Sequence, residues 1–197
     1  GALLTQDIAA LTTAAVGALT TRQVNLGLST NQIAALTTAQ VVALRTDQAT
    51  ALSSNQAVAL STAQLSAMET QDVAALNTAA VGALTTNQIV ALESSQIAAL
   101  QTTQMAALTT AQIGALSTQD VTGLSTGQVA ALSSNAVAAF STDQIGSGLS
   151  TDQIVALRTD QIAALQTSQV IVLSTDQLTA METQDVAALN TAAIGAL

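Results

Sequence analysis

An eight-residue repeat runs through the chain and limits its possible folds more than any other feature. Aligned on leucine, the repeat reads A-L-x-[ST]-x-Q-[IV]-x, and its fourth position is Ser or Thr in all 24 copies. Met68, Phe140 and Met181 replace the leucine at the second position with other large apolar residues. The fold must therefore give the same apolar and hydroxyl positions similar surroundings every eight residues.

One continuous helix does not satisfy this repeat. Eight residues advance a helix by roughly 800°, so each leucine lies about 80° away from the previous one. Over five repeats the leucines spread around the whole cylinder, whereas a stable seam between helices needs a spacing near 3.5 residues. A single long helix or coiled coil is excluded.

A β-solenoid is the alternative that stays open. An even repeat returns each leucine to one face of a strand, but the aliphatic seventh position then points to the opposite face. The chain contains no Pro and few Asn-Gly-type turns, and Ala, Gln and Leu are not typical strand residues.

The preferred interpretation is a short helix that ends and restarts in every octad. A Ser or Thr before each Q-[IV]-x-A-L run is typical of an N-cap, whose hydroxyl accepts a backbone N–H of the first turn. Where the third position is also Ser or Thr, it forms an S/T-x-x-Q capping box with the Gln of position six. Either the third or the fourth position can be the cap.

The charges give an independent check of this interpretation. Nine of the twelve acids follow the fourth-position hydroxyl by one or two residues, in the expected first turn, where the helix dipole favours a carboxylate. Arg45 and Arg158 occupy position three, which we expect to lie near the end of the preceding helix, where cations are favoured. The nine acids are Asp7, Asp47, Asp72, Asp120, Asp143, Asp152, Asp160, Asp176 and Asp185.

Such short helices are unstable alone and must pack in a stack. Two large aliphatic side chains per octad, each contributing about 1.5–3 kcal/mol when buried, can hold successive coils together. The sequence therefore predicts an all-α, tight solenoid with one helical turn per 8-residue repeat, spanning residues 1–197 as a single array. The register slips by one residue at NLGLS (25–29) and GSGLS (146–150), where we expect glycine to absorb unusual dihedrals.

Residues 61–84 recur almost unchanged at residues 174–197, with Ala63, Ser66 and Val81 replaced by Asp176, Thr179 and Ile194. Active sites are seldom duplicated so literally, whereas structural units often are. Together with a start at Gly1 that lacks the features of a signal peptide, this duplication leads us to expect a segment of a longer protein.

Composition excludes several classes of function. The net charge of −9, with Arg22, Arg45 and Arg158 as the only cations, disfavours nucleic acid and anionic membranes. Polar residues interrupt every apolar run, which excludes membrane insertion. Without His, Cys or Lys, we expect no enzyme, no catalytic, cofactor-binding or metal site, and no cofactor. The closest acid pairs, Glu69 with Asp72 and Glu182 with Asp185, supply too few oxygens for calcium.

The run LSTDQIVALRTDQIAALQTSQV (149–170) resembles the L-T-x-x-Q-I-x-A-L octapeptide arrays of very long bacterial surface or secreted adhesin-like proteins. The likeness covers essentially the whole chain and implies an extracellular or cell-surface location. Such proteins often carry a haem-utilisation label, but the only conceivable axial ligands here are Met68, Met105 and Met181. Two of these occupy the leucine position, so we expect them in the core.

The expected function is structural: a segment of an extracellular bacterial filament, fibre or adhesin stalk, without catalysis, that associates with itself end to end. One alternative is a binding module that recognises a protein or glycan through one face of the solenoid. A further alternative is an ice-binding lattice of threonines, although we expect the fourth-position hydroxyls to be occupied in capping.

Overall fold

The structure is a computed structural model that describes residues 4–195 and 197. Within these residues the regular structure is entirely helical, one short helix per octad, and no strand is present. The all-α prediction is confirmed and the β-solenoid alternative is wrong. Because each octad carries its own cap and its own two aliphatic residues, each forms its own helix.

The chain divides into two compact units, Gly1–Leu100 and Gln101–Leu197, each of which is described by itself. The first unit contains α1 (Thr5–Ala9), α2 (Thr13–Gly17), η1 (Gln23–Gly27), α3 (Thr30–Ala34), α4 (Thr38–Val42), α5 (Thr46–Ala51), α6 (Ser54–Ala59), α7 (Thr62–Ala67), α8 (Thr70–Ala75), α9 (Thr78–Ala83), α10 (Thr86–Val90) and α11 (Ser94–Ala98). The second contains α12 (Thr102–Ala107), α13 (Thr110–Gly114), α14 (Thr118–Thr122), α15 (Thr126–Ala131), α16 (Ser134–Ala138), η2 (Gln144–Gly148), α17 (Thr151–Val155), α18 (Thr159–Ala163), α19 (Thr167–Val170), α20 (Thr175–Ala180), α21 (Thr183–Ala188) and α22 (Thr191–Ile194).

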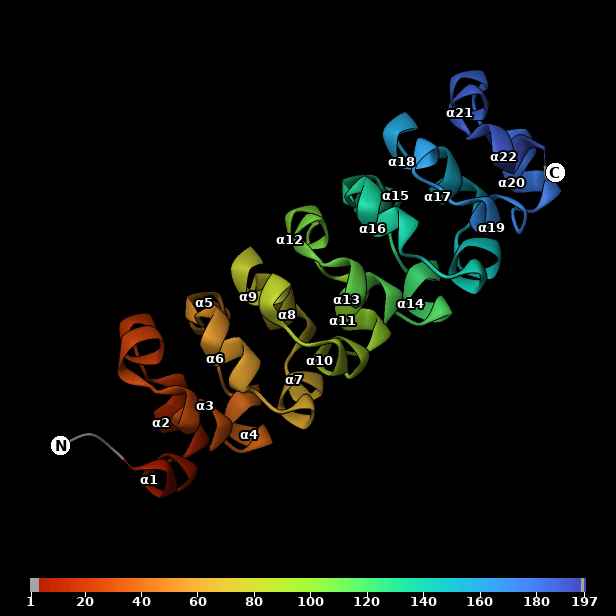
Figure 1. Ribbon diagram of the computed structural model, residues 1–197. Coiled ribbons are helices and arrows are strands. Elements are labelled where there is room, and N and C mark those ends of the chain that lie inside the picture. Colours follow the sequence, from red (N-terminus) through yellow and green to blue (C-terminus); the bar gives the residue numbers. More distant parts are fainter. Residues whose placement is uncertain (1–3, 196) are drawn as a thin grey trace. The chain divides into compact units, whose positions relative to one another are not determined.

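Within each unit, helices pack against the helix three positions further along the chain. In the first unit α3 packs on α6 and α6 on α9, and in the second α12 packs on α15 and α17 on α20 (Figure 1). One coil of the solenoid therefore holds three octads, or 3 × 8 = 24 residues where no slip intervenes. The sequence repeat by itself did not determine this number.

The helix cap is position three of the octad and not position four. Ser61 has extended dihedrals (φ −70°, ψ 161°), and its hydroxyl accepts the backbone N–H of Gln64. The fourth-position residue, Thr62 here, is the first residue of the helix. Position three is thus the cap, and the expectation that the fourth-position hydroxyls are occupied in capping is wrong.

The dihedrals at the end of each octad explain why the helix restarts. Leu52 and Leu60 adopt extended conformations (ψ 128° and 135°), and each is followed by an equally extended cap residue. Two extended residues lead the chain into the next helix and point the leucine inward. The helices are consequently only four to six residues long.

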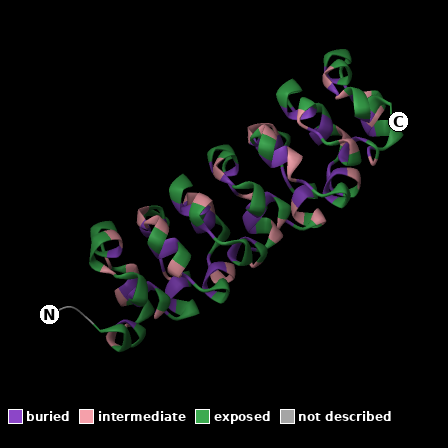
Figure 2. Ribbon diagram, in the orientation of Figure 1, coloured by how far each residue is buried: buried purple, intermediate pink, exposed green. Residues whose placement is uncertain are grey.

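The core consists of the aliphatic seventh position and the large apolar second position. Ile33, Ile97 and Ile162 are at most 1% exposed, and Leu36 is 4% exposed. Figure 2 shows these buried residues along the helix faces that turn toward neighbouring helices, with exposed residues on the outer faces. The predicted pair of core positions is confirmed in the interior of both units.

The two register slips take the form of π-helical turns, η1 and η2, in which one extra residue widens the helix. No glycine among the described residues has a positive φ, so the expectation of unusual dihedrals was wrong. The glycines of η2 serve close packing instead. A Cβ on Gly146 would lie 2.8 Å from the carbonyl oxygen of Val172, whereas one on Gly27 in η1 would meet nothing closer than 3.8 Å.

Candidate functional site: the buried glutamine network

The sixth-position glutamines are the most regular polar feature of the molecule. In the α-helices each is the third residue, Gln23 and Gln144 begin η1 and η2, and fifteen of the sixteen are less than 9% exposed. Burying an amide is costly unless its hydrogen bonds are made inside the protein. They are Gln32, Gln40, Gln48, Gln56, Gln64, Gln88, Gln96, Gln104, Gln112, Gln128, Gln144, Gln153, Gln161, Gln169 and Gln177.

Gln64 shows how the amide is satisfied. Its Oε1 accepts the backbone N–H of Ser61 at 2.6 Å, which completes the capping box of α7. Its Nε2 donates to the carbonyl oxygens of Leu36, at 2.6 Å, and Ile33, at 3.3 Å, at the end of α3. One side chain therefore caps the start of its own helix and the end of a helix four octads earlier.

The same geometry recurs along both units. Gln40 donates to the carbonyl oxygens of Ile8 (2.9 Å) and Leu11 (2.7 Å), and Gln161 donates to those of Val129 (3.1 Å) and Leu132 (2.7 Å). The last carbonyls of a helix have no partner inside that helix, so each short helix needs outside donors. We call these glutamines and the carbonyls they reach the glutamine network.

The buried side chains of the network are satisfied wherever the structure describes the chain. No buried side-chain nitrogen or oxygen of the described residues lacks a hydrogen-bond partner. Buried polar networks that are fully satisfied rigidify a fold, whereas partly satisfied ones are costly. The chemistry available here is hydrogen bonding between coils.

One octad type replaces glutamine by alanine and compensates at another position. Ala80 has no side-chain donor, but the cap residue of the same helix is Asn77, whose Oδ1 accepts the Ala80 N–H at 2.9 Å. The Nδ2 of Asn77 donates to the carbonyl of Leu52 at 2.6 Å. The Leu52 carbonyl lies 28 residues before Ala80. Gln64 reaches the Leu36 carbonyl over the same interval, so a glutamine at position 80 would donate to Leu52.

The second unit repeats this compensation with Ala193 and Asn190. Asn190 accepts the Ala193 N–H at 2.8 Å and donates to the carbonyl of Leu165 at 3.0 Å. These residues lie 113 positions after their counterparts, within the duplicated block. The duplication thus copies a hydrogen-bonding unit as well as a sequence.

Another octad type places an aspartate in the glutamine position. Asp72 and Asp185 are only 2% and 4% exposed, and each accepts a hydrogen bond from a threonine hydroxyl, Thr46 or Thr159, at 2.8 Å. Burial raises the pKa of the Asp72 carboxyl, the negative charge of Glu69 adds to this, and the Thr46 hydroxyl opposes it. An ionised carboxylate cannot donate to a carbonyl, so these octads lack the glutamine bonds to the coil below.

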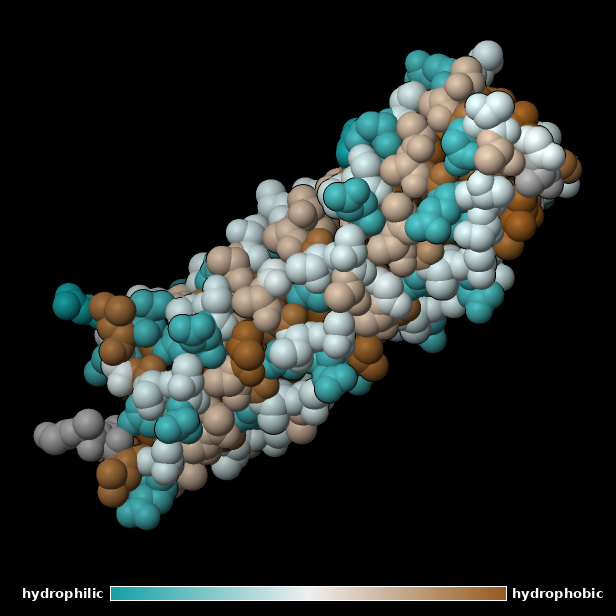
Figure 3. Space-filling view, in the orientation of Figure 1, coloured by the Kyte–Doolittle hydropathy of each residue, from teal (hydrophilic) through white to brown (hydrophobic). Residues whose placement is uncertain are grey.

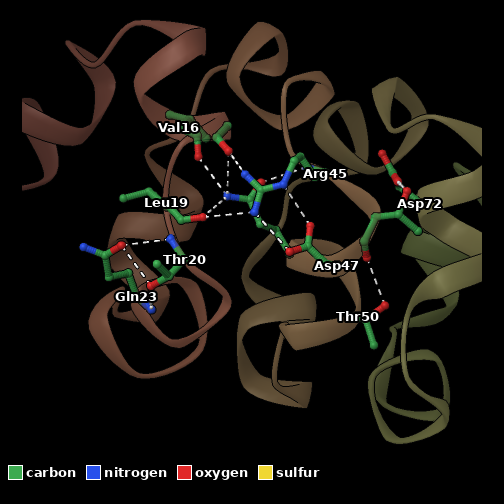
Figure 4. Close-up of polar contacts among 11 residues, drawn as sticks. Val16, Leu19, Thr20, Gln23, Arg45, Asp47, Thr50 and Asp72 are labelled. Atoms are coloured by element: carbon green, nitrogen blue, oxygen red, sulfur yellow. Dashed lines mark hydrogen bonds and ion pairs between the residues drawn. The ribbon is translucent and has the colours of Figure 1, made fainter.

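The arginines form an exposed variant of the same link between coils. Arg45 pairs with Asp47 through two 3.0 Å contacts, and its guanidinium donates to the carbonyls of Gly17 and Leu19 (Figure 4). Arg158 makes the equivalent contacts to Asp160, Ala130 and Leu132.

Both arginines are cap residues of α5 and α18, so the expectation that they end the preceding helix is wrong. Their guanidinium groups do contact carbonyls at helix ends, but these helices lie four octads earlier in the chain. The hydrogen bond from Arg45 lowers the pKa of Asp47, and that from Arg158, together with the Ser134 hydroxyl, lowers the pKa of Asp160.

The remaining acids mostly lie where the helix dipole predicts. Asp7, Asp47, Asp72, Asp120, Asp152, Asp160, Asp176 and Asp185 are first-turn residues, as expected. Asp143 differs, because it precedes the π-turn η2.

The methionines lie in the core, as predicted. Met68 and Met181 fill the leucine position at 4% and 8% exposure, and Met105 fills the aliphatic position at 0%. Among the described residues no group of three acids, histidines or cysteines could hold a metal ion. No helix of the described residues is long and apolar enough to cross a membrane.

The second role of the glutamines escaped the sequence analysis, which recognised only the capping box. The sequence did contain a signal. Position six is Gln, Asp or Ala but never Glu, although a capping box accepts Glu equally well. An amide differs from a carboxylate in its ability to donate, so the predominance of Gln over Glu indicates that a donor is used in most octads.

The fold and the network define a class: an α-helical repeat solenoid whose coils are joined by core side chains and buried amides. The chain belongs to the ALTTAQ repeat family, whose repeat matches residues 1–38, 26–54, 65–102, 97–134, 116–147, 127–159 and 148–181. A comparison with curated proteins gave no match.

Proposed function

We propose that the chain is a structural, non-catalytic segment of an extracellular bacterial filament, fibre or adhesin stalk, and that it associates with itself end to end. One observation carries the proposal: the buried polar side chains of the described residues bond within the solenoid. The visible surface mixes hydrophilic and hydrophobic residues without a concentrated polar cluster (Figure 3). Hydrogen bonds of this kind hold successive coils together, as a structural segment requires.

Self-association is supported by apolar surface at the first coil of unit 1. Leu4 and Leu26 are 60% and 74% exposed, and together with Leu28 they line an open cavity of about 600 Å³. In the last coil of unit 2, Val186 and Ile194 are 40% and 44% exposed. Leu28, Val186 and Ile194 occupy positions two and seven of the repeat, which are buried in the core elsewhere, and this makes a second copy a fitting partner.

Gln23 supports the same partner. Its Oε1 accepts the Thr20 N–H at 2.8 Å, as in the other capping boxes, but its side chain is exposed. Within the described residues its Nε2 has no acceptor, unlike the Nε2 of Gln64. The carbonyls at the end of a second copy would supply acceptors of the kind that every buried glutamine uses.

Electron microscopy and analytical ultracentrifugation of the purified 197-residue chain test this proposal. We expect rods that lengthen with concentration, and more strongly at higher salt, because salt screens the repulsion between chains of charge −9. Leu26→Glu should abolish association without loss of helical signal, whereas Val90→Glu, at an exposed residue on the side of unit 1, should not. A wild-type chain that stays monomeric at high concentration would overturn the proposal.

The extracellular, bacterial setting is part of the proposal and rests on the resemblance to octapeptide arrays of surface proteins. Labelling of intact cells of the source organism with an antibody against this segment tests it. Surface labelling is expected, and labelling only after the cells are permeabilised would contradict it.

Ice binding remains a second candidate because of one observation. The fourth-position hydroxyls do not cap the helices, and residues such as Thr62, Thr86 and Thr110 are exposed. Three described members of the set, Thr46, Ser134 and Thr159, donate to carboxylates instead. Thermal hysteresis of the purified chain tests this candidate, and freezing behaviour equal to that of an inert protein eliminates it.

A further inference from the structure

Two octads of the described residues bury an ionisable group where most others bury an amide. Asp72 is the third residue of α8 and Asp185 the third residue of α21, the position of glutamine in most octads. Both are at least 96% buried, since their exposures are 2% and 4%. Burial at this depth disfavours the charged form of a carboxyl.

These octads leave acceptors of the coil below without their usual donor. Gln64 donates to the carbonyls of Ile33 and Leu36, which lie 31 and 28 residues before it. At the same intervals, a glutamine at position 72 would donate to the carbonyls of Val41 and Leu44. In the described residues these two carbonyls accept no side-chain hydrogen bond. The same holds for Ile154 and Leu157, which are the corresponding carbonyls for Asp185.

The surroundings of both carboxyls offer little to stabilise a negative charge. Asp72 receives one hydroxyl, from Thr46, and Glu69 on its own octad carries a like charge. Of the helices packed on α8, α5 carries Arg45 and Asp47, which pair with each other, and α11 begins after Glu93.

Asp185 has corresponding surroundings in unit 2. Thr159 supplies its hydroxyl, Glu182 precedes its helix, and the packed helix α18 carries the paired Arg158 and Asp160. In both coils the only nearby cation is already engaged by another carboxylate.

We propose that Asp72 makes its coil more stable in acid, so that proton uptake by its carboxyl tightens the contact between α8 and α5, the helix three octads earlier. The protonated carboxyl gains an O–H, carries no charge to desolvate and no longer repels the neighbouring glutamate. Octads that are closed by glutamine amides do not respond in this way. Asp185 is buried at the equivalent place in the second unit, where it accepts the Thr159 hydroxyl.

The direction of the effect follows from linkage. The pKa of Asp72 is raised in the folded chain, so the folded state binds a proton more readily than the unfolded state does. Its contribution to stability is complete below the ordinary Asp pKa of about 3.9 and is lost as the pH rises through the folded value. Stabilisation on mild acidification is unusual, because paired surface carboxylates such as Asp47 act in the opposite direction.

The test compares the wild-type chain with Asp72→Gln in urea unfolding between pH 4.5 and pH 8. We expect the variant to unfold at higher urea at pH 8, because it regains the amide donor. The difference should shrink as the pH falls and the wild type takes up its proton. A difference that stays constant with pH, or a wild type that is the more stable at pH 8, would overturn the proposal.

Two further measurements keep the result interpretable. In the wild type, the side-chain carboxyl resonance of Asp72 should titrate above the ordinary Asp pKa of about 3.9, and titration at or below that value would refute the proposal. Asp176→Asn is the matched surface control. In this variant the free energy of unfolding should change with pH in the same direction as in the wild type.

Discussion

Residues 61–68 and 69–76 are consecutive octads that reach the same backbone structure by different means. Both form six-residue helices, α7 and α8, and both bury their aliphatic residue fully, Leu65 and Val73. The first has a hydroxyl cap and a glutamine that binds two carbonyls, whereas the second begins at Glu69, without a side-chain cap, and buries Asp72. Apolar burial therefore suffices to form the helix, and the polar links are additions to it.

The relative energies explain this order of importance. A buried aliphatic side chain contributes about 1.5–3 kcal/mol, whereas a hydrogen bond contributes a net 0.5–1.5 kcal/mol. Loss of one glutamine removes a link without removing the core. The chain can thus vary position six among Gln, Asp and Ala while the stack of helices is preserved.

The largest effect should come from the core that the two octads share. Leu65→Ala removes a fully buried side chain and should lower the free energy of unfolding by about 2–5 kcal/mol, measured by urea denaturation. The change Leu26→Ala, at a residue that is 74% exposed, is the matched control and should have little effect under conditions where the chain is monomeric. Equal losses for the two variants would show that the apolar core is not what both octads depend on.

A smaller effect is expected when the polar link of the first octad is removed. Gln64→Ala leaves the buried carbonyls of Ile33 and Leu36 without this donor and should cost about 1–3 kcal/mol, measured in the same way. Gln71→Ala, at an exposed residue whose amide donates to Glu69 on the surface, serves as the control. If both changes cost the same, the network does not stabilise the fold.

Exchange of one polar link for another sharpens the comparison further. Asn77→Ala removes both a cap and the bond to Leu52, and we expect a cost of about 1–2 kcal/mol. The double change Asn77→Ser/Ala80→Gln installs the common octad and should recover most of that loss. A double variant less stable than Asn77→Ala would mean that the two links are not interchangeable.

The smallest effect is expected at the surface. Arg45→Ala removes the hydrogen bonds that hold the pKa of Asp47 down, so that pKa should rise toward the ordinary Asp value of about 3.9 in a carboxyl NMR titration. Because the pair is exposed, stability at neutral pH should barely change, and the small contribution of Asp47 should no longer be lost as the pH falls. Arg22→Ala, which removes a cation outside this pair, should leave the pKa of Asp47 unchanged.

Much of the helix-level structure could be predicted because it depends on local rules. The capping box at Ser61 and Gln64, the first-turn carboxylates and the two core positions all follow from contacts within one octad. The π-turns could not be foreseen in form, since the same glycine-containing slip is compatible with several backbone solutions. At Gly146 the deciding contact, with the carbonyl of Val172, comes from another helix.

The candidate site was only half visible for a similar reason. The sequence shows each glutamine beside its own cap, but the carbonyls that it reaches lie 28 to 32 residues earlier. That interval depends on three octads filling one coil, and the octad pattern by itself is compatible with other numbers. The burial of Asp72 was hidden for the same reason, because the coils on either side of it bury it.

The amino-acid sequence by itself determined that this chain forms short, capped helices with two buried aliphatic positions in each, since caps and dipoles act over a few bonds. Only the tertiary structure decided how many octads complete a coil and where each amide finds its acceptors. Those distances are set by how the side chains of distant octads fill the space between helices, a packing problem that no single octad contains.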